Sequence, residues 1–230
     1  MKSQNFFQYL LAKKQSALLF VALATLCLSF SCQIKPYVTM PGYEEFIVAK
    51  SLLILPLQSH NIQISDELEK AFGQKASDSL YISFFEENFS NILGRISSFA
   101  KVTHNPDNPA GLRAMEVIVP GNDTTYFYLP GNNKSLSSKK EESADFLLFL
   151  SGLQLAPSWI DIEYDQNPNI RHTIYYLFWD NQKHKIVCYG KSSYSAALSK
   201  NDKRSFQLLI NNLAKSLIES TPFHKILNQW

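Results

Sequence analysis

The sequence predicts an α/β (α+β) fold, a single mixed sheet packed by two long helices, which follows an N-terminal signal peptide. Short apolar runs indicate strands, two longer segments place apolar side chains at helical spacing, and helices and strands do not alternate strictly. Strict alternation is typical of a doubly wound parallel sheet, so a mixed α/β sandwich fits better. The expected organisation is a signal peptide at 1–31, a tether at 32–45 and a single α/β sandwich domain at 46–230.

The N-terminal half is expected to supply a buried strand and a long helix. Residues 51–57 form an apolar run interrupted only by a proline near its end, which is typical of a strand buried on both faces. Ser65 is suited to cap a first helical segment. A longer helix is expected from Ser77, because apolar residues then recur every three or four positions, at Leu80, Tyr81, Phe84, Phe85, Phe89, Ile92, Leu93 and Ile96. This spacing favours core packing over a ligand pocket.

Further strands are expected in the middle of the chain, at 99–104, 115–119 and 124–129. The last two form a hairpin, because their connection contains Gly121 and Asn122, which tolerate a positive φ. The proline-containing cluster at 105–109 predicts a loop, and the polar residues 132–143 predict an exposed one.

The C-terminal half carries the clearest strand signals. Three strands and a closing amphipathic helix are expected there, at 145–150, 173–180, 185–191 and 203–220. Pro222 ends the helix. Residues 157–169 are expected to form an excursion from the sheet edge.

The first thirty-two residues have the three parts of an export signal. The only charges before Cys32 are three lysines, residues 17–28 are almost wholly apolar, and Ser31 is small and precedes a possible cleavage point. A membrane-spanning signal anchor is disfavoured, because the apolar run is shorter than the roughly 20 residues that a span needs. An ordinary cleaved signal peptide, with Cys32 an incidental thiol, stays an alternative.

The sequence Leu28-Ser29-Phe30-Ser31-Cys32 resembles the lipobox of a bacterial lipoprotein. The resemblance implies a lipoprotein signal peptide at 1–31, acyl chains on Cys32, and membrane attachment through that residue. Gln33, in the place where Asp would signal inner-membrane retention, implies an outer-membrane anchor that faces the periplasm in a Gram-negative envelope.

The charge and the cysteine content exclude one class of partner and one kind of cross-link. Removal of 1–31 takes away three lysines and no acids, so the formal net charge falls from +2 to about −1. Nucleic acid is not an expected partner, because binding it needs a concentrated basic excess. Cys188 would be the sole cysteine besides Cys32, so an acylated Cys32 leaves no intradomain disulfide.

No catalytic residue, metal site or cofactor is predicted. Gly190-Lys191-Ser192 has the tail of a phosphate-binding loop, but the required first glycine is replaced by Lys185. Cys188 lies in an apolar run, which favours a buried thiol over a nucleophile served by His172 or His184. The five histidines have no metal-ligand spacing. Asp161, Glu163 and Asp165 alternate, and a solvated acidic edge is favoured over a calcium site.

The order of elements is similar to that of envelope lipoproteins of the CsgG, LpoB and TolB-amino-terminal type. The residues that carry the resemblance are a Leu-Leu-Ile-Leu-Pro strand, Ala144-Asp145-Phe146-Leu147-Leu148, a Trp179-Asp180 hairpin that ends at Tyr189-Gly190, and the closing helix. The resemblance implies a non-enzymatic adaptor in the envelope.

The favoured function is a non-catalytic envelope lipoprotein, a periplasm-facing docking or assembly module with an envelope protein as partner. One alternative is a secreted or membrane-anchored hydrolase of envelope polymers that uses Asp161 and Glu163. Another is a ligand-binding protein. Trp159 and Tyr164 are the candidate interaction surface in the docking and ligand-binding hypotheses.

Overall fold

The computed structural model describes residues 36–45, 47, 51–58, 60–62, 78–107, 109–131, 144–158, 169–197 and 203–224. All of them belong to one compact unit, Lys35–Trp230. The signal peptide, the helical segment expected from Ser65 and the loop expected at 132–143 lie outside the described residues. Within the described part, no helix is long and apolar enough to cross a membrane.

The fold class is confirmed as α+β with a mixed sheet and two long helices. Seven strands form the main sheet, and six lie in the order β1 (Tyr37–Thr39), β9 (Lys185–Ala197), β8 (Asn169–Asp180), β7 (Phe146–Ser158), β2 (Ser51–Ile54) and β4 (Lys101–His104). The seventh, β3 (His60–Ile62), pairs with β7 further along the same strand. Pairs that involve β2 or β3 are parallel, and the others are antiparallel.

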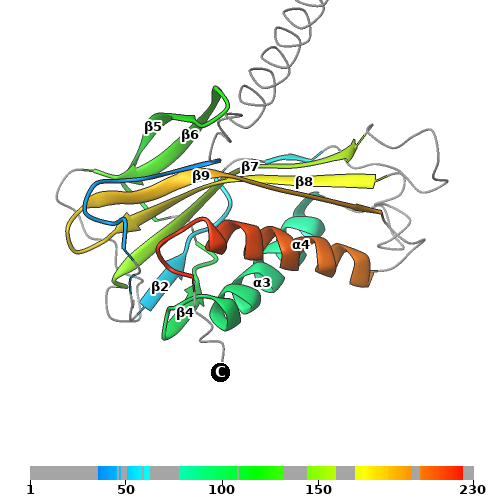
Figure 1. Cartoon of the computed structure of the whole chain (residues 1–230), viewed down its shortest axis with the longest axis horizontal. Helices are drawn as coiled ribbons and strands as arrows, with labels where there is room; N and C mark the ends of the chain where they lie inside the picture. The colour runs from blue at the N-terminus through cyan, green and yellow to red at the C-terminus, as the bar shows by residue number, and fades with distance from the viewer. Residues whose placement is uncertain are drawn as a thin grey trace, which may run out of the picture. The chain divides into compact units, whose positions relative to one another are not determined.

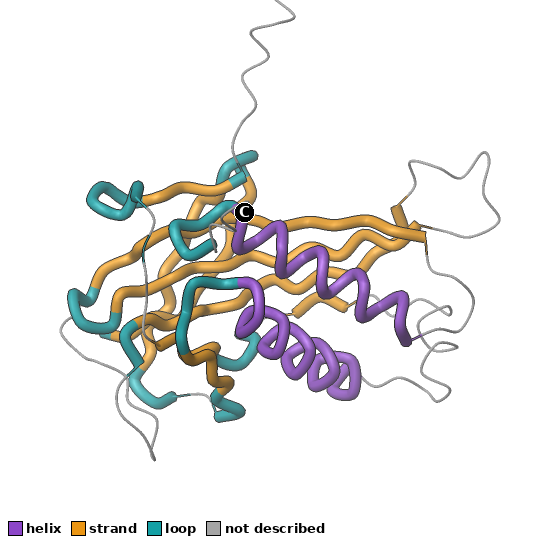
Figure 2. The backbone as a smooth tube through the Cα atoms, turned by 60° about the horizontal axis from the view of Figure 1, so that its bottom comes forward, coloured by secondary structure: helices purple, strands orange, loops and turns teal. Residues whose placement is uncertain are grey.

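Two helices, α3 (Asp78–Ile96) and α4 (Lys203–Glu219), cover one face of the main sheet (Figure 1). The predicted stripe of α3 is confirmed by Tyr81, Phe85, Phe89 and Leu93, which are fully buried. Leu80 is exposed, because it precedes Tyr81 and its side chain points about 100° away around the helix. In the tube view, which brings the bottom of Figure 1 forward, the same helices lie in front of the strands (Figure 2).

A hairpin of β5 (Leu112–Val119) and β6 (Asp123–Pro130) forms a second, two-stranded sheet. It contributes to a second apolar cluster on the main sheet's other face, where its buried side chains meet those of β2, β7 and β8. The predicted turn is confirmed, since φ is +96° at Gly121 and +64° at Asn122. The single sheet expected from the sequence is therefore accompanied by this separate hairpin, whose docking on the main sheet leaves no local signal.

Strands β7 and β8 are longer than expected. The segment predicted to leave the sheet, 157–169, is therefore shorter than predicted at both of its ends. Pro157 pairs with Ile170, and Ser158 pairs with Asn169, which leaves only 159–168 outside the described strands. A bulge after Ser151 lets β7 bend within this length. Gly152 adopts φ +62° there, and a Cβ on it would lie 2.4 Å from the Tyr175 ring, so the bulge requires glycine.

Candidate interaction surface

The outward side of the β5–β6 hairpin exposes apolar side chains to solvent. Its members are Ala114, Glu116, Ile118, Thr124, Tyr126 and Tyr128, which we call the hairpin outer face. Ile118 is 63% exposed, Tyr126 53% and Tyr128 45%. Among the described residues, three of the six large apolar side chains that are exposed belong to this face. Contiguous apolar exposure of this kind is typical of an interaction site.

The inward side of the same hairpin is packed, and this packing fixes the outer face in position. Val117, Val119, Phe127 and Leu129 are buried against side chains of the main sheet. Successive residues of a strand point to opposite sides. The burial of these four residues therefore forces Glu116, Ile118, Tyr126 and Tyr128 outward.

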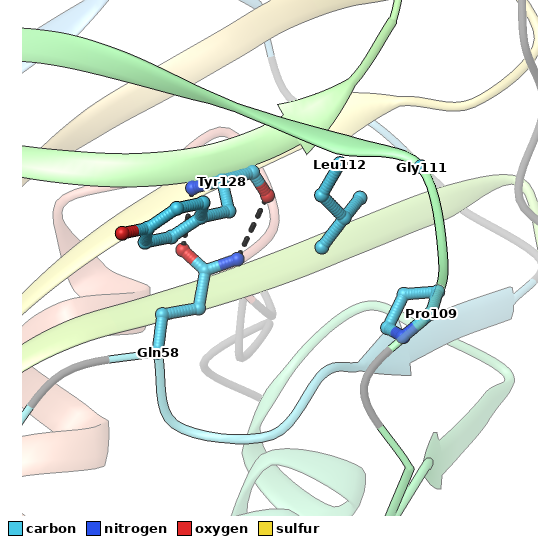
Figure 3. Close-up of a pocket in the computed structure, with 5 residues that line it drawn as sticks. All are labelled: Gln58, Pro109, Gly111, Leu112 and Tyr128. Carbon is cyan, nitrogen blue, oxygen red and sulfur yellow. Dashed lines mark hydrogen bonds between the residues drawn. The ribbon is translucent and has the colours of Figure 1, made fainter.

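Gln58 holds one edge of the hairpin. Its side-chain amide donates to Tyr128 O at 2.8 Å, and Tyr128 N donates to Gln58 Oε1 at 2.9 Å, as the dashed lines in Figure 3 show. The Gln58 backbone N–H donates to Leu150 O at 2.9 Å, which ties Gln58 to β7. Gln58 thus connects the edge of β6 to the main sheet, as a further strand would.

Ser151 makes a second connection on the same edge. Its hydroxyl donates to Tyr126 O at 2.9 Å and lies 3.4 Å from Thr125 Oγ1. Ser151 is fully buried. A hydroxyl in this position satisfies a β6 carbonyl that has no strand partner.

Asp123 anchors the hairpin near its turn. Lys191 Nζ donates to Asp123 Oδ2 at 2.5 Å, and the Tyr175 hydroxyl donates to the same oxygen at 3.2 Å. The hydrogen bond and charge of Lys191 hold the pKa of Asp123 below its ordinary value. Burial, with the neighbouring Asp123 carboxylate, raises the pKa of Tyr175 to about 12. The hairpin is therefore attached to the main sheet near both ends.

A pocket of about 380 Å³ lies at the Leu112 end of the hairpin. It is lined by Gln58, Pro109, Gly111, Leu112 and Tyr128 (Figure 3). Both polar groups of the Gln58 side chain are engaged with the Tyr128 backbone. The volume of the pocket lies near the lower end of the range for ligand sites, which commonly span about 300–1,000 Å³.

The helix-covered core contains Cys188 and His172, two of the groups that the sequence offered for chemistry. Cys188 is fully buried, and burial raises the pKa of its thiol, so the thiolate is disfavoured. His172 Nε2 and the Tyr81 hydroxyl share a hydrogen bond of 2.6 Å. Burial lowers the pKa of His172 to about 3, which keeps its ring neutral. These residues fill the core, and Cys188 is buried as the sequence indicated.

The structure does not test the site residues that were predicted from the sequence. Cys32, Trp159 and Tyr164 lie outside the described residues, as do Asp161, Glu163 and Asp165. Within the described part, no group of three or more His, Cys, Asp or Glu side chains is placed to hold a metal ion.

Sequence reasoning missed the hairpin outer face, although a signal for it was present. Apolar residues occur at successive positions in Val117-Ile118-Val119 and Tyr126-Phe127-Tyr128. A strand with one face on a core and one in water alternates apolar and polar residues. Apolar residues on both faces of a hairpin therefore indicate that the outer face is covered by a further layer or serves as an interaction surface.

Comparison with known proteins yields likenesses in structure alone. No protein-family model matches the chain, and no curated protein does either. Among solved structures, the hypothetical protein CT253 from Chlamydia trachomatis is 14% identical, with 74% of this chain and 94% of that chain covered and a TM-score of 0.43. Protein XCC0632 from Xanthomonas campestris is 10% identical, with 79% and 87% covered and a TM-score of 0.41.

The lipoprotein GNA1162 from Neisseria meningitidis is 8% identical, with 74% of this chain and 99% of that chain covered and a TM-score of 0.27. A lipoprotein is thus among the structures that this chain is similar to. At TM-scores below 0.5 these likenesses carry no argument about function. The resemblance to the CsgG, LpoB and TolB-amino-terminal type stays a prediction.

Proposed function

We propose that this protein is a non-catalytic lipoprotein of the bacterial cell envelope, a docking or assembly module that binds an envelope protein through its hairpin outer face. The observation that carries the proposal is the solvent exposure of Ile118, Tyr126 and Tyr128 on a hairpin that is anchored to the main sheet. Tyrosine is enriched at protein interfaces, because its ring supplies apolar area and its hydroxyl supplies a hydrogen bond.

The export signal supports the compartment. An acylated Cys32 would attach the domain to the outer membrane. The tether expected at 32–45 is too long, because Tyr37–Thr39 pair with β9 and Tyr43 is buried in the core, so only the few residues before Tyr37 would separate the lipid from the main sheet. A partner in the same envelope would then meet the domain at high local concentration.

Mass spectrometry of the native N-terminus tests the compartment. The expected result is a chain that begins at an acylated Cys32, and a Cys32→Ser variant that leaves the membrane fraction. An intact, unacylated chain that begins at Met1 and is recovered from the cytosol would contradict the proposal.

Site-specific photo-crosslinking in intact envelopes tests the docking surface. A photoreactive phenylalanine analogue at position 126 is expected to capture one discrete partner protein. The matched control is position 208, because Leu208 is also a large exposed apolar residue, at 54%, but lies on α4 in the helix layer. Equal capture from both positions, or none from position 126, would refute this surface.

A further inference from the structure

We propose that β5 accepts an extended segment of the partner protein as an additional antiparallel strand, and that this segment places a basic residue opposite Glu116 between two apolar residues. The inference rests on the proposed docking function and specifies which partner chemistry the hairpin takes.

The backbone of β5 has an open edge. Because Tyr128 N–H and C=O both bind Gln58, they point away from β5. Ala114 lies directly opposite Tyr128. In an antiparallel pair, the backbone N–H and C=O groups of two opposite residues point either both toward each other or both outward, so those of Ala114 point away from β6. The same holds two and four residues further, at Glu116 and Ile118.

Among the residues that the structure describes, β6 is the only strand paired with β5. The three N–H and three C=O groups of Ala114, Glu116 and Ile118 therefore stand in a row without a strand partner in the described part of the chain. Such a row is a template for another extended chain.

In the described part of the chain, the open edge of β5 is longer than the two strands that end the path of the main sheet. The terminal strands on the main sheet's path, β1 and β4, have three and four residues, whereas β5 has eight. Proteins commonly limit unwanted pairing by keeping edge strands short. The β6 edge is closed by Gln58 and Ser151. A long edge left open beside exposed apolar side chains is suited to strand addition.

The side chains of β5 define the partner sequence. Glu116 is the only charged residue on the hairpin outer face, and it lies between Ala114 and Ile118 along the strand. The Tyr126 hydroxyl donates to Glu116 Oε2 at a long 3.4 Å, which leaves the carboxylate able to accept a stronger donor. An added strand would put its alternate side chains directly opposite these three, where unlike charges stabilise and like charges destabilise.

A second copy of this chain fits the surface less well than a single strand. A stable interface of standard size buries about 800 Å² on each partner. Three roughly half-exposed apolar side chains on one hairpin supply only part of that area. Pairing of two β5 strands centred on Glu116 would also bring the two carboxylates opposite each other. Strand addition needs less area, because main-chain hydrogen bonds contribute much of its affinity.

The test uses the purified full-length mature protein and a synthetic peptide of seven residues, acetyl-Thr-Leu-Thr-Lys-Thr-Val-Thr-amide. Its matched control carries Glu in place of the central Lys. In an NMR titration, the amide signals of Ala114, Glu116 and Ile118 are expected to shift most. The lysine peptide is expected to bind about fivefold more tightly than the control, in line with cross-strand charge pairs.

A charge reversal and a backbone block complete the test. Glu116→Lys, an exposed substitution whose folding is checked by the same spectra, is expected to reverse the preference toward the glutamate peptide. N-methylation of the peptide's Leu, Lys and Val amides is expected to abolish binding, because those N–H groups would donate to β5.

Equal affinity for both peptides, unchanged binding after N-methylation, or no shift at millimolar peptide would overturn strand addition. Self-association seen by sedimentation, together with protection of these β5 amides from hydrogen exchange in the self-associated protein, would do so as well. If crosslinks from position 126 were still found, the docking face would stand and only the mode of pairing would fall. Peptide binding without envelope crosslinks would support strand addition and remove the proposed envelope role.

Discussion

The two faces of the main sheet are covered in different ways. Two helices bury their large apolar side chains against one face, and that layer encloses His172 and Cys188 completely. On the other face a two-stranded hairpin contributes four buried side chains to the apolar cluster and leaves Ile118, Tyr126 and Tyr128 in solvent. The first face is a closed core, whereas the second combines a packed core with apolar side chains that stay exposed to solvent.

The contrast predicts that a cavity in the helix layer has the largest effect on stability. Phe89 is fully buried and stacks with Phe85 at a centroid distance of 5.0 Å. Phe89→Ala is expected to lower the free energy of unfolding by about 3–5 kcal/mol, because it removes contacts and leaves a void. Chemical denaturation measures the loss, with Phe89→Leu as a milder control. A loss below about 1 kcal/mol would remove the distinction between the two faces.

The same core is expected to make stability depend on pH. His172 has a pKa of about 3 in the folded protein, against about 6.5 in an unfolded chain. Between these values the unfolded state binds a proton that the folded state does not, so stability falls as the pH falls below 6.5. The loss is about 2 kcal/mol by pH 5, since each pH unit corresponds to about 1.4 kcal/mol.

Denaturation at several pH values tests this dependence. The double variant His172→Phe and Tyr81→Phe removes both partners of the 2.6 Å hydrogen bond, and its stability curve is expected to lack this slope. An unchanged slope in the variant would assign the acid sensitivity to other groups.

The helix layer was predictable from the sequence, whereas the role of the hairpin was not. The stripe on α3 follows from spacing within one segment, and Gly121 and Asn122 specify a hairpin turn locally. The docking of that hairpin depends on Gln58 and Tyr128, which are 70 residues apart and carry no pairing signal. Trp159 and Tyr164 lie outside the described residues, so the interaction surface that their aromatic side chains suggest stays a prediction.

The attachment of the hairpin gives a smaller predicted effect. Gln58→Ala removes both hydrogen bonds to the Tyr128 backbone and is expected to cost about 1 kcal/mol. Hydrogen exchange at the Tyr128 amide is expected to accelerate before exchange in α3. Gln207→Ala is the matched control, because it removes a single exposed hydrogen bond between the helices, to Asn88. Equal exchange in the two variants would mean that Gln58 does not hold the hairpin.

The smallest effect on stability is expected on the hairpin outer face itself. Ile118→Ser changes a side chain that is 63% exposed, so the free energy of unfolding is expected to change by less than about 0.5 kcal/mol. If the face binds a partner, capture by the photoreactive group at position 126 is nevertheless expected to fall severalfold in this variant. Leu208→Ser is the control in the helix layer, and it is expected to change neither quantity. Loss of capture without loss of stability would assign Ile118 to binding, because a structural residue would change both together.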